Sequence, residues 1–81
     1  MTREEVFNGV QDIFRDIFDE DYLIISDTVS SDEIEDWDSL NHINLASAIE
    51  AEFKIKFSLG ELTVLKNVGA MVDLIVKKQN D

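Results

Sequence analysis

Three stretches of this chain repeat apolar residues at intervals of three and four, and this periodicity limits the fold more than any other feature. A period near 3.6 gathers apolar side chains on one face of a helix. The stretches cover about residues 2–18, residues 39–53 and the segment after Asn67. The apolar residues expected in the core are Val6, Val10, Ile13, Phe14, Ile17, Leu45, Ala48, Ile49, Phe53, Val68, Met71, Val72 and Ile75.

The segments between these stretches lack a sustained period. Residues 19–38 are rich in turn and cap residues, and the apolar run 22–25 is expected to fasten this long loop to the core. Residues 54–57 alternate, but no other segment offers a partner strand. Ser58 is expected to cap a short helical turn. The sequence therefore predicts an all-α fold, a small bundle of three main helices plus one short helix, with residues 1–81 forming one domain.

Charge and composition narrow the classes of partner. The net charge of −11 disfavours nucleic acid, which is bound through Lys and Arg, and favours basic protein surfaces. The same acidity equally fits a role in solubility alone. The chain has no cysteine, and no apolar run approaches the ~18 residues of a membrane span. We expect a soluble, cytoplasmic monomer without a membrane span or a thiolate metal site.

Enzyme and metal templates fit the sequence poorly. Ser39 and His42 are neighbours on a helix, but no orienting acid or pocket is evident, so we expect no catalytic residues. His42 is expected at the surface or half-buried. The acidic segment 27–38 has no glycine and its acids do not follow the calcium-loop spacing, so we expect no metal site there.

The sequence Asp38-Ser39-Leu40 stands at the expected start of the second helix. The first amides of a helix have no partners within the helix, and the dipole there favours negative charge. A serine in the first turn is therefore a suitable attachment point for a phosphodiester, and Asp38 is a good N-cap. An ordinary cap explains these three residues equally simply.

The wider sequence resembles the acyl carrier protein family. The resemblance rests on Glu-Asp-Trp-Asp-Ser-Leu-Asn-His-Ile at 35–43, on Ala-Ile-Glu-Ala-Glu-Phe at 48–53 and on Asn-Val at 67–68. It covers nearly the whole chain. The resemblance implies that Ser39 receives 4'-phosphopantetheine from coenzyme A through a holo-carrier synthase, a phosphopantetheinyl transferase. It also implies that Asp38 assists the magnesium ion bound by the transferase.

The resemblance further implies a function without catalysis. The chain would carry acyl intermediates as thioesters and deliver them to acyl-loading and acyl-processing enzymes with basic docking surfaces, in fatty-acid, polyketide or related biosynthesis. Acyl chains would lie in a cleft between the helices, among the core residues. The residues expected on the face that partners recognise are Asp38, Leu40, Ile43, Asn44 and Ser47.

The sequence departs from the housekeeping fatty-acid carriers at three positions. Asn41 and Asn44 stand where acids are usual, and Trp37 stands where a small residue is usual. These residues look more like those of specialised, stand-alone carriers. Two alternatives remain open at this point: an aminoacyl, peptidyl or D-alanyl carrier, and an acidic helical interaction module without a prosthetic arm.

Overall fold

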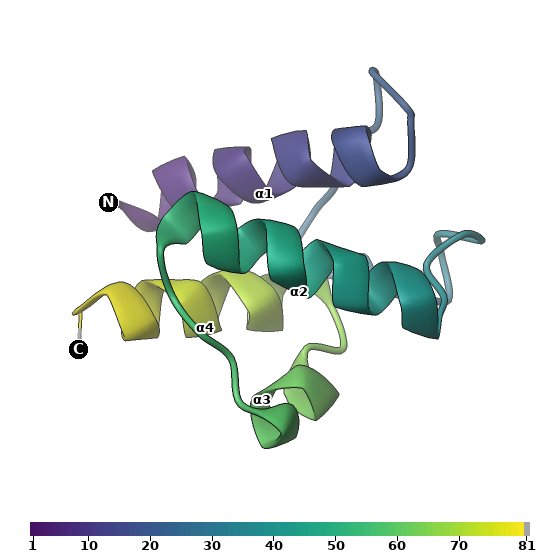
Figure 1. Ribbon diagram of the computed structural model, residues 1–81. Coiled ribbons are helices and arrows are strands. Elements are labelled where there is room, and N and C mark those ends of the chain that lie inside the picture. The colour runs from purple at the N-terminus through teal and green to yellow at the C-terminus, as the bar shows by residue number, and fades with distance from the viewer. Residues whose placement is uncertain (81) are drawn as a thin grey trace.

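A computed structural model of the chain describes residues 1–80 and contains four helices in this part of the chain (Figure 1). They are α1 (Arg3–Ile17), α2 (Ser39–Phe53), α3 (Leu59–Val64) and α4 (Val68–Asn80). Within residues 1–80 the only β pairing is an isolated bridge between Ser30 and Asn67. The predicted bundle of three main helices and one short helix is confirmed. None of these four helices has the length and apolar character needed to cross a membrane.

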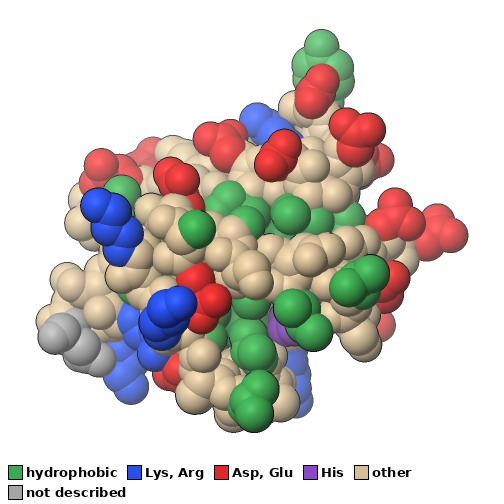
Figure 2. All heavy atoms as spheres, in the orientation of Figure 1, with side chains coloured by type: hydrophobic (Ala, Val, Ile, Leu, Met, Phe, Trp, Pro, Cys, Tyr) green, Lys and Arg blue, Asp and Glu red, His purple; other side chains and the backbone are tan. Residues whose placement is uncertain are grey.

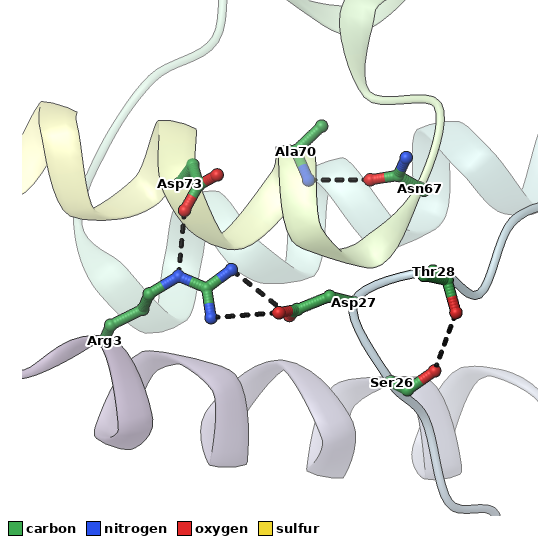
Figure 3. Close-up of polar contacts among 7 residues, drawn as sticks. All are labelled: Arg3, Ser26, Asp27, Thr28, Asn67, Ala70 and Asp73. Carbon is green, nitrogen blue, oxygen red and sulfur yellow. Dashed lines mark hydrogen bonds and ion pairs between the residues drawn. The ribbon is translucent and has the colours of Figure 1, made fainter.

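The helices begin at residues whose side chains bind the free amides of the first turn. Thr2 and Glu5 form a capping box at α1, and Ser58 and Glu61 form a second one at α3. Asn67 Oδ1 accepts a hydrogen bond of 2.8 Å from an amide in the first turn of α4 (Figure 3). These caps are short-range contacts, which is why the sequence predicted all three starts.

The core lies where α1 packs against both α2 and α4 (Figure 1). Most of the predicted core residues are buried, whereas Ile13, Ile17 and Ala48 are half-buried. Further buried hydrophobic residues come partly from outside the periodic stretches. They are Phe18, Ile25, Trp37, Ala46 and Leu65. The core thus extends from the three main helices into the loops that connect them.

The prediction that the apolar run 22–25 fastens the loop between α1 and α2 to the core is correct for two of its four residues, Leu23 and Ile25. Ile25 is buried, but Tyr22 and Ile24 are 93% and 79% exposed, so the apolar run does not dock as a unit. Hydrogen bonds between side chains of α1 and the loop backbone secure this part of the loop, together with the buried Ile25 and the half-buried Leu23. Arg15 Nε, on α1, donates to the carbonyl oxygen of Leu23 at 2.7 Å. The apolar composition of residues 22–25 therefore predicted more burial than the structure shows.

A second set of contacts joins the middle of this loop to α1 and α4. Arg3 donates to the carboxylates of Asp73 at 2.8 Å and of Asp27 at 3.2 and 3.3 Å (Figure 3). These hydrogen bonds, first to Asp73 and then to Asp27, raise the pKa of Arg3. The Gly69 amide donates to Asp27 O at 2.9 Å, and a Cβ at Gly69 would lie only 3.0 Å from that oxygen. Glycine thus permits the close approach of loop and helix.

Candidate functional site

The first turn of α2 presents an exposed serine at a capped helix start. Asp38 is the N-cap, and its Oδ1 accepts a hydrogen bond of 2.8 Å from the Asn41 amide. The first intrahelical bond runs from the His42 amide to Asp38 O at 2.8 Å. The amides of Ser39 and Leu40 precede that bond, so they remain available to an anion at the helix end. The arrangement fits a phosphodiester on the Ser39 hydroxyl.

The segment before Ser39 is held by hydrogen bonds from the same helical turn. Asn41 Nδ2 donates to Asp36 O at 2.7 Å, and the Asp38 amide donates to the same carbonyl oxygen at 2.9 Å. Asn41 is half-buried. An aspartate at this position has no N–H to donate. Asn41 therefore has a structural role that the sequence analysis missed when it treated the residue only as a departure from acidic carriers.

Two hydrogen bonds connect one residue each from the α1–α2 loop, α2 and α3 close to Ser39. Trp37 Nε1 donates to His42 Nδ1 at 3.0 Å, and His42 Nε2 lies 3.0 Å from Leu62 O. An indole N–H can only donate and a carbonyl oxygen can only accept, so in this arrangement His42 accepts through Nδ1 and donates through Nε2. We call these three residues, Trp37, His42 and Leu62, the clasp. His42 is half-buried, as the sequence predicted, but its partners were not predicted.

The clasp also occupies the ring nitrogens that a serine–histidine pair would need. Both ring nitrogens of His42 are occupied, one by an indole N–H and the other by a backbone carbonyl oxygen. A general base needs a free nitrogen within reach of the nucleophile. His42 therefore cannot activate Ser39 in this arrangement.

A pocket of ≈ 940 Å³ lies beside Ser39. Ser39 lines its wall together with all three clasp residues, and Leu59 and Leu65 add apolar surface. Ser30 and Asn67, the pair in the isolated bridge, contribute polar groups. Volumes of this order suit small molecules and cofactors. The pocket lies between the start of α2, α3 and the ends of two loops, rather than among the fully buried core residues.

An apolar surface surrounds this pocket. Leu40 and Ile43 on α2 are 68% and 56% exposed, and Leu59 at the start of α3 is 84% exposed. Hydrophobic side chains gather over α2 and α3 in Figure 2, while acidic side chains gather over α1 and at the ends of the α1–α2 loop. Asn44 and Ser47, also expected on this face, are exposed. The second apolar stripe predicted on α2 is therefore a surface feature.

The wall formed by α3 is attached to α4 by an ion pair. Lys78 Nζ lies 2.8 Å from Glu61 Oε1. The hydrogen bond from Lys78, followed by that from the Ser58 amide, lowers the pKa of Glu61. Within residues 1–80, no group of three or more potential ligand side chains converges on a metal site.

Fold and site together define a class of protein: a small helical domain that presents a serine at a helix N-terminus beside an apolar pocket, as carrier domains do. The profile of a family described as "Phosphopantetheine attachment site" matches residues 8–75. The chain is 35% identical to an acyl carrier protein of Petrotoga mobilis, over 82 residues that cover 99% of this chain and 94% of that protein. It resembles the solution structure of holo acyl carrier protein from Geobacter metallireducens with a TM-score of 0.86 and 44% identity, covering 93% of this chain and 86% of the other.

The chain therefore belongs to the acyl carrier protein family. It is a carrier of acyl groups rather than a catalyst, and its prosthetic group is a covalently attached 4'-phosphopantetheine. A carrier of this type interacts with a phosphopantetheinyl transferase and with biosynthetic enzymes. The prosthetic group supplies a thiol for thioester formation, while the chain supplies attachment and recognition.

Proposed function

We propose that Ser39 is the residue that carries the arm. The observation that supports this most strongly is the combination of an exposed serine at the first position of α2 with the pocket that it lines. Ser39 also lies within the family match. A phosphodiester there would lie beside the free amides of Ser39 and Leu40, where the helix dipole favours its negative charge.

Other serines lack this combination. Ser58 begins α3, but its Oγ already accepts the Glu61 amide in the capping box. Ser26 and Ser30 use their hydroxyls within the loop, with Thr28 Oγ1 and with the Asp32 amide respectively. Ser47 is exposed in the middle of α2, away from the helix start. These contacts support Ser39 over the four serines compared here.

Intact-mass measurement tests the assignment. The purified apo chain, incubated with coenzyme A, magnesium and a phosphopantetheinyl transferase, should gain the mass of one arm. Ser39→Ala should gain none and keep its helical circular dichroism. Ser26→Ala, at an exposed serine in the α1–α2 loop outside the pocket, is the control and should gain one arm. A mass gain in Ser39→Ala would contradict the proposal.

We also propose that Asp38, Leu40, Ile43, Asn44 and Ser47 form the face that partners recognise. All five are exposed and lie beside or after Ser39 along α2. Asp38 keeps one carboxylate oxygen free of the cap, which suits contact with the transferase's magnesium ion. The net charge of −11 favours acyl-loading and acyl-processing enzymes with basic docking surfaces.

Asn44→Glu tests the charge of this face. Asn41 is left unchanged because it secures Asp36. One added exposed ion pair is typically worth under ~1 kcal/mol, so kcat/KM with a housekeeping ketosynthase should rise by up to roughly fivefold. The gain should disappear in high salt. An unchanged kcat/KM at low salt would show that residue 44 does not restrict partner choice.

We propose a specialised acyl carrier that works as a single-domain monomer in the cytoplasm. The neutral residue 44 and Trp37 support a dedicated pathway of the polyketide or polysaccharide kind over central fatty-acid synthesis. The absence of cysteine suits a reducing compartment.

A further inference from the structure

The turn that precedes Ser39 is fixed by a ring of hydrogen bonds that closes on Asn41. The Asn41 backbone amide donates to Asp38 Oδ1 at 2.8 Å, and its side-chain Nδ2 donates to Asp36 O at 2.7 Å. The Asp38 amide completes the ring by donating to the same carbonyl oxygen at 2.9 Å. Asn41 therefore contacts both the side chain of the N-cap and the backbone two residues before the N-cap. Ser39 begins α2 directly after this ring.

The side-chain amide of Asn41 faces a suitable partner at each end. Its Oδ1 accepts from Asn44 Nδ2 at 3.3 Å, while its Nδ2 faces the loop carbonyl oxygen. An aspartate at this position would have no N–H to donate and would place an oxygen against that carbonyl oxygen. It would also add a like charge near the exposed Asp36 and Asp38. Asparagine therefore closes a turn that an acid would open.

This turn controls how Ser39 leaves the loop. The buried Trp37 holds the middle of the turn from the core side, and Asn41 holds it from α2. Without the side-chain bond from Asn41, the exposed residues Asp36 and Asp38 would be free to take other backbone conformations. A hydroxyl group reacts only from a near-attack geometry. A looser turn would therefore lower the fraction of carriers in which Ser39 is correctly placed.

We propose that Asn41 is a positioning residue for phosphopantetheine attachment, acting on Ser39 through the turn formed by Asp36 and Asp38 rather than by contact with the transferase. In the attachment step, the serine oxygen forms a bond to the phosphorus that carries pantetheine. The anhydride bond of coenzyme A breaks, the adenosine bisphosphate leaves, and the hydroxyl proton passes to a base supplied by the transferase. The inference rests on the proposed attachment at Ser39.

Single-turnover labelling separates placement from contact. The apo chain is mixed with coenzyme A, magnesium and an excess of transferase, and its intact mass is followed over time. The maximum rate at saturating transferase reports the placement of Ser39, and the half-saturating transferase concentration reports contact. Asn41→Ala should lower the maximum rate by about two- to tenfold, the effect of one lost hydrogen bond, with the half-saturating concentration unchanged. Asn41→Asp should lower the rate at least as much, whereas Asn41→Gln, which keeps an N–H donor, should recover part of it.

Asn8 supplies the matched controls, because it is an exposed asparagine on α1. Asn8→Ala and Asn8→Asp make the same chemical changes away from the turn, and both should keep the wild-type maximum rate. NMR adds a measurement on the wild-type chain that needs no enzyme. The Nδ2 protons of Asn41 should exchange with solvent more slowly than those of Asn8. In Asn41→Ala, the Asp38 amide should lose exchange protection while the buried Ile75 keeps it.

The outcomes separate this inference from the attachment itself. A mass gain in Ser39→Ala would refute the attachment site. A wild-type maximum rate in Asn41→Ala, or a change in its half-saturating concentration alone, would overturn the positioning role. A rate for Asn41→Gln as low as that of Asn41→Asp would show that the N–H donor is not what matters. If Asn41→Ala does not fold, the comparison of the glutamine and aspartate variants decides, and equal exchange of Asn41 and Asn8 in the wild type would refute the bond.

Discussion

Ile49→Ala and Ile43→Ala make the same chemical change on two faces of α2. Ile49 is fully buried, and Ile43 is 56% exposed beside the pocket. Removing a buried isoleucine side chain to Cβ costs about 2–5 kcal/mol, because transfer free energy is lost and a cavity remains. Complete burial of an isoleucine is worth about 1.5–3 kcal/mol, so the partly covered Ile43 should contribute ~1 kcal/mol or less. The pair therefore isolates burial from residue type.

The difference is large for a domain of this size. A core of this size supplies about 3–5 kcal/mol in total, so Ile49→Ala should leave little net stability. At about 4–8 °C per kcal/mol, its Tm should fall by at least ~8 °C, whereas that of Ile43→Ala should fall by ~8 °C or less. Thermal unfolding followed by circular dichroism measures both values. Leu45→Ala and Leu40→Ala repeat the comparison with leucine, since Leu45 is fully buried and Leu40 is 68% exposed.

Partner kinetics supply the second half of this test. Ile43→Ala should reduce kcat/KM with the phosphopantetheinyl transferase although the domain stays folded, because its side chain is expected to contact partners. Equal losses of stability for Ile43→Ala and Ile49→Ala would refute the assignment of two faces. Unchanged transferase kinetics for a folded Ile43→Ala would refute its role in recognition.

Further predictions concern glycine positions and pH. A Cβ at Gly9 would lie 2.8 Å from Cζ of the buried Phe53, so Gly9→Ala should lower the free energy of unfolding by about 1–3 kcal/mol, less the gain in helix propensity. Gly60→Ala, where a Cβ would have no neighbour closer than 4.0 Å, should raise it by about 0.5–1 kcal/mol in urea unfolding; a loss in both variants would contradict the packing argument. Glu61 has a lowered pKa in the folded chain, so its pairing with Lys78 stabilises the fold above the unfolded pKa and is lost as pH falls through the folded pKa. Glu61→Gln should therefore be less stable than the wild type at neutral pH, and the gap should close below the ordinary value of 4.5; a gap independent of pH would disprove the coupling.

The sequence predicted those parts of the fold that depend on local contacts. The starts of α2, α3 and α4 follow from caps only three residues from their partners, at Asp38, Ser58 and Asn67. The buried faces of α1, α2 and α4 follow from the helical period of their apolar residues. The same reasoning predicted the exposed stripe of Leu40 and Ile43, because a short surface helix buries only one face.

The α1–α2 loop and the clasp depend on contacts that cannot be read from the periodicity of apolar residues. The exposure of Tyr22 is decided by how the backbone turns, and Arg15 fixes that turn through a carbonyl oxygen. The bond from His42 to Leu62 joins a side chain to a backbone atom twenty residues away. Trp37 stood out only as an unusual residue before Asp-Ser, and that signal could have suggested a partner five residues later.

The geometry of α2 explains how Ser39 is placed without any direct constraint on its side chain. Asp38 before it caps the helix, Asn41 holds the carbonyl oxygen of Asp36, and His42 holds the indole of Trp37. Consecutive side chains on a helix point in directions about 100° apart, so Asn41 and His42 secure the loop from different sides. The first turn of α2 is thereby fixed by neighbours, and Ser39 stays exposed at the start of the helix. Both anchors need side chains that hydrogen-bond as Asn and His do here, so the low acidity directly after Ser39 is first a requirement of the fold. Asn44, whose Nδ2 donates to Asn41 Oδ1 at 3.3 Å, is the exposed position on this turn where the charge can still be changed.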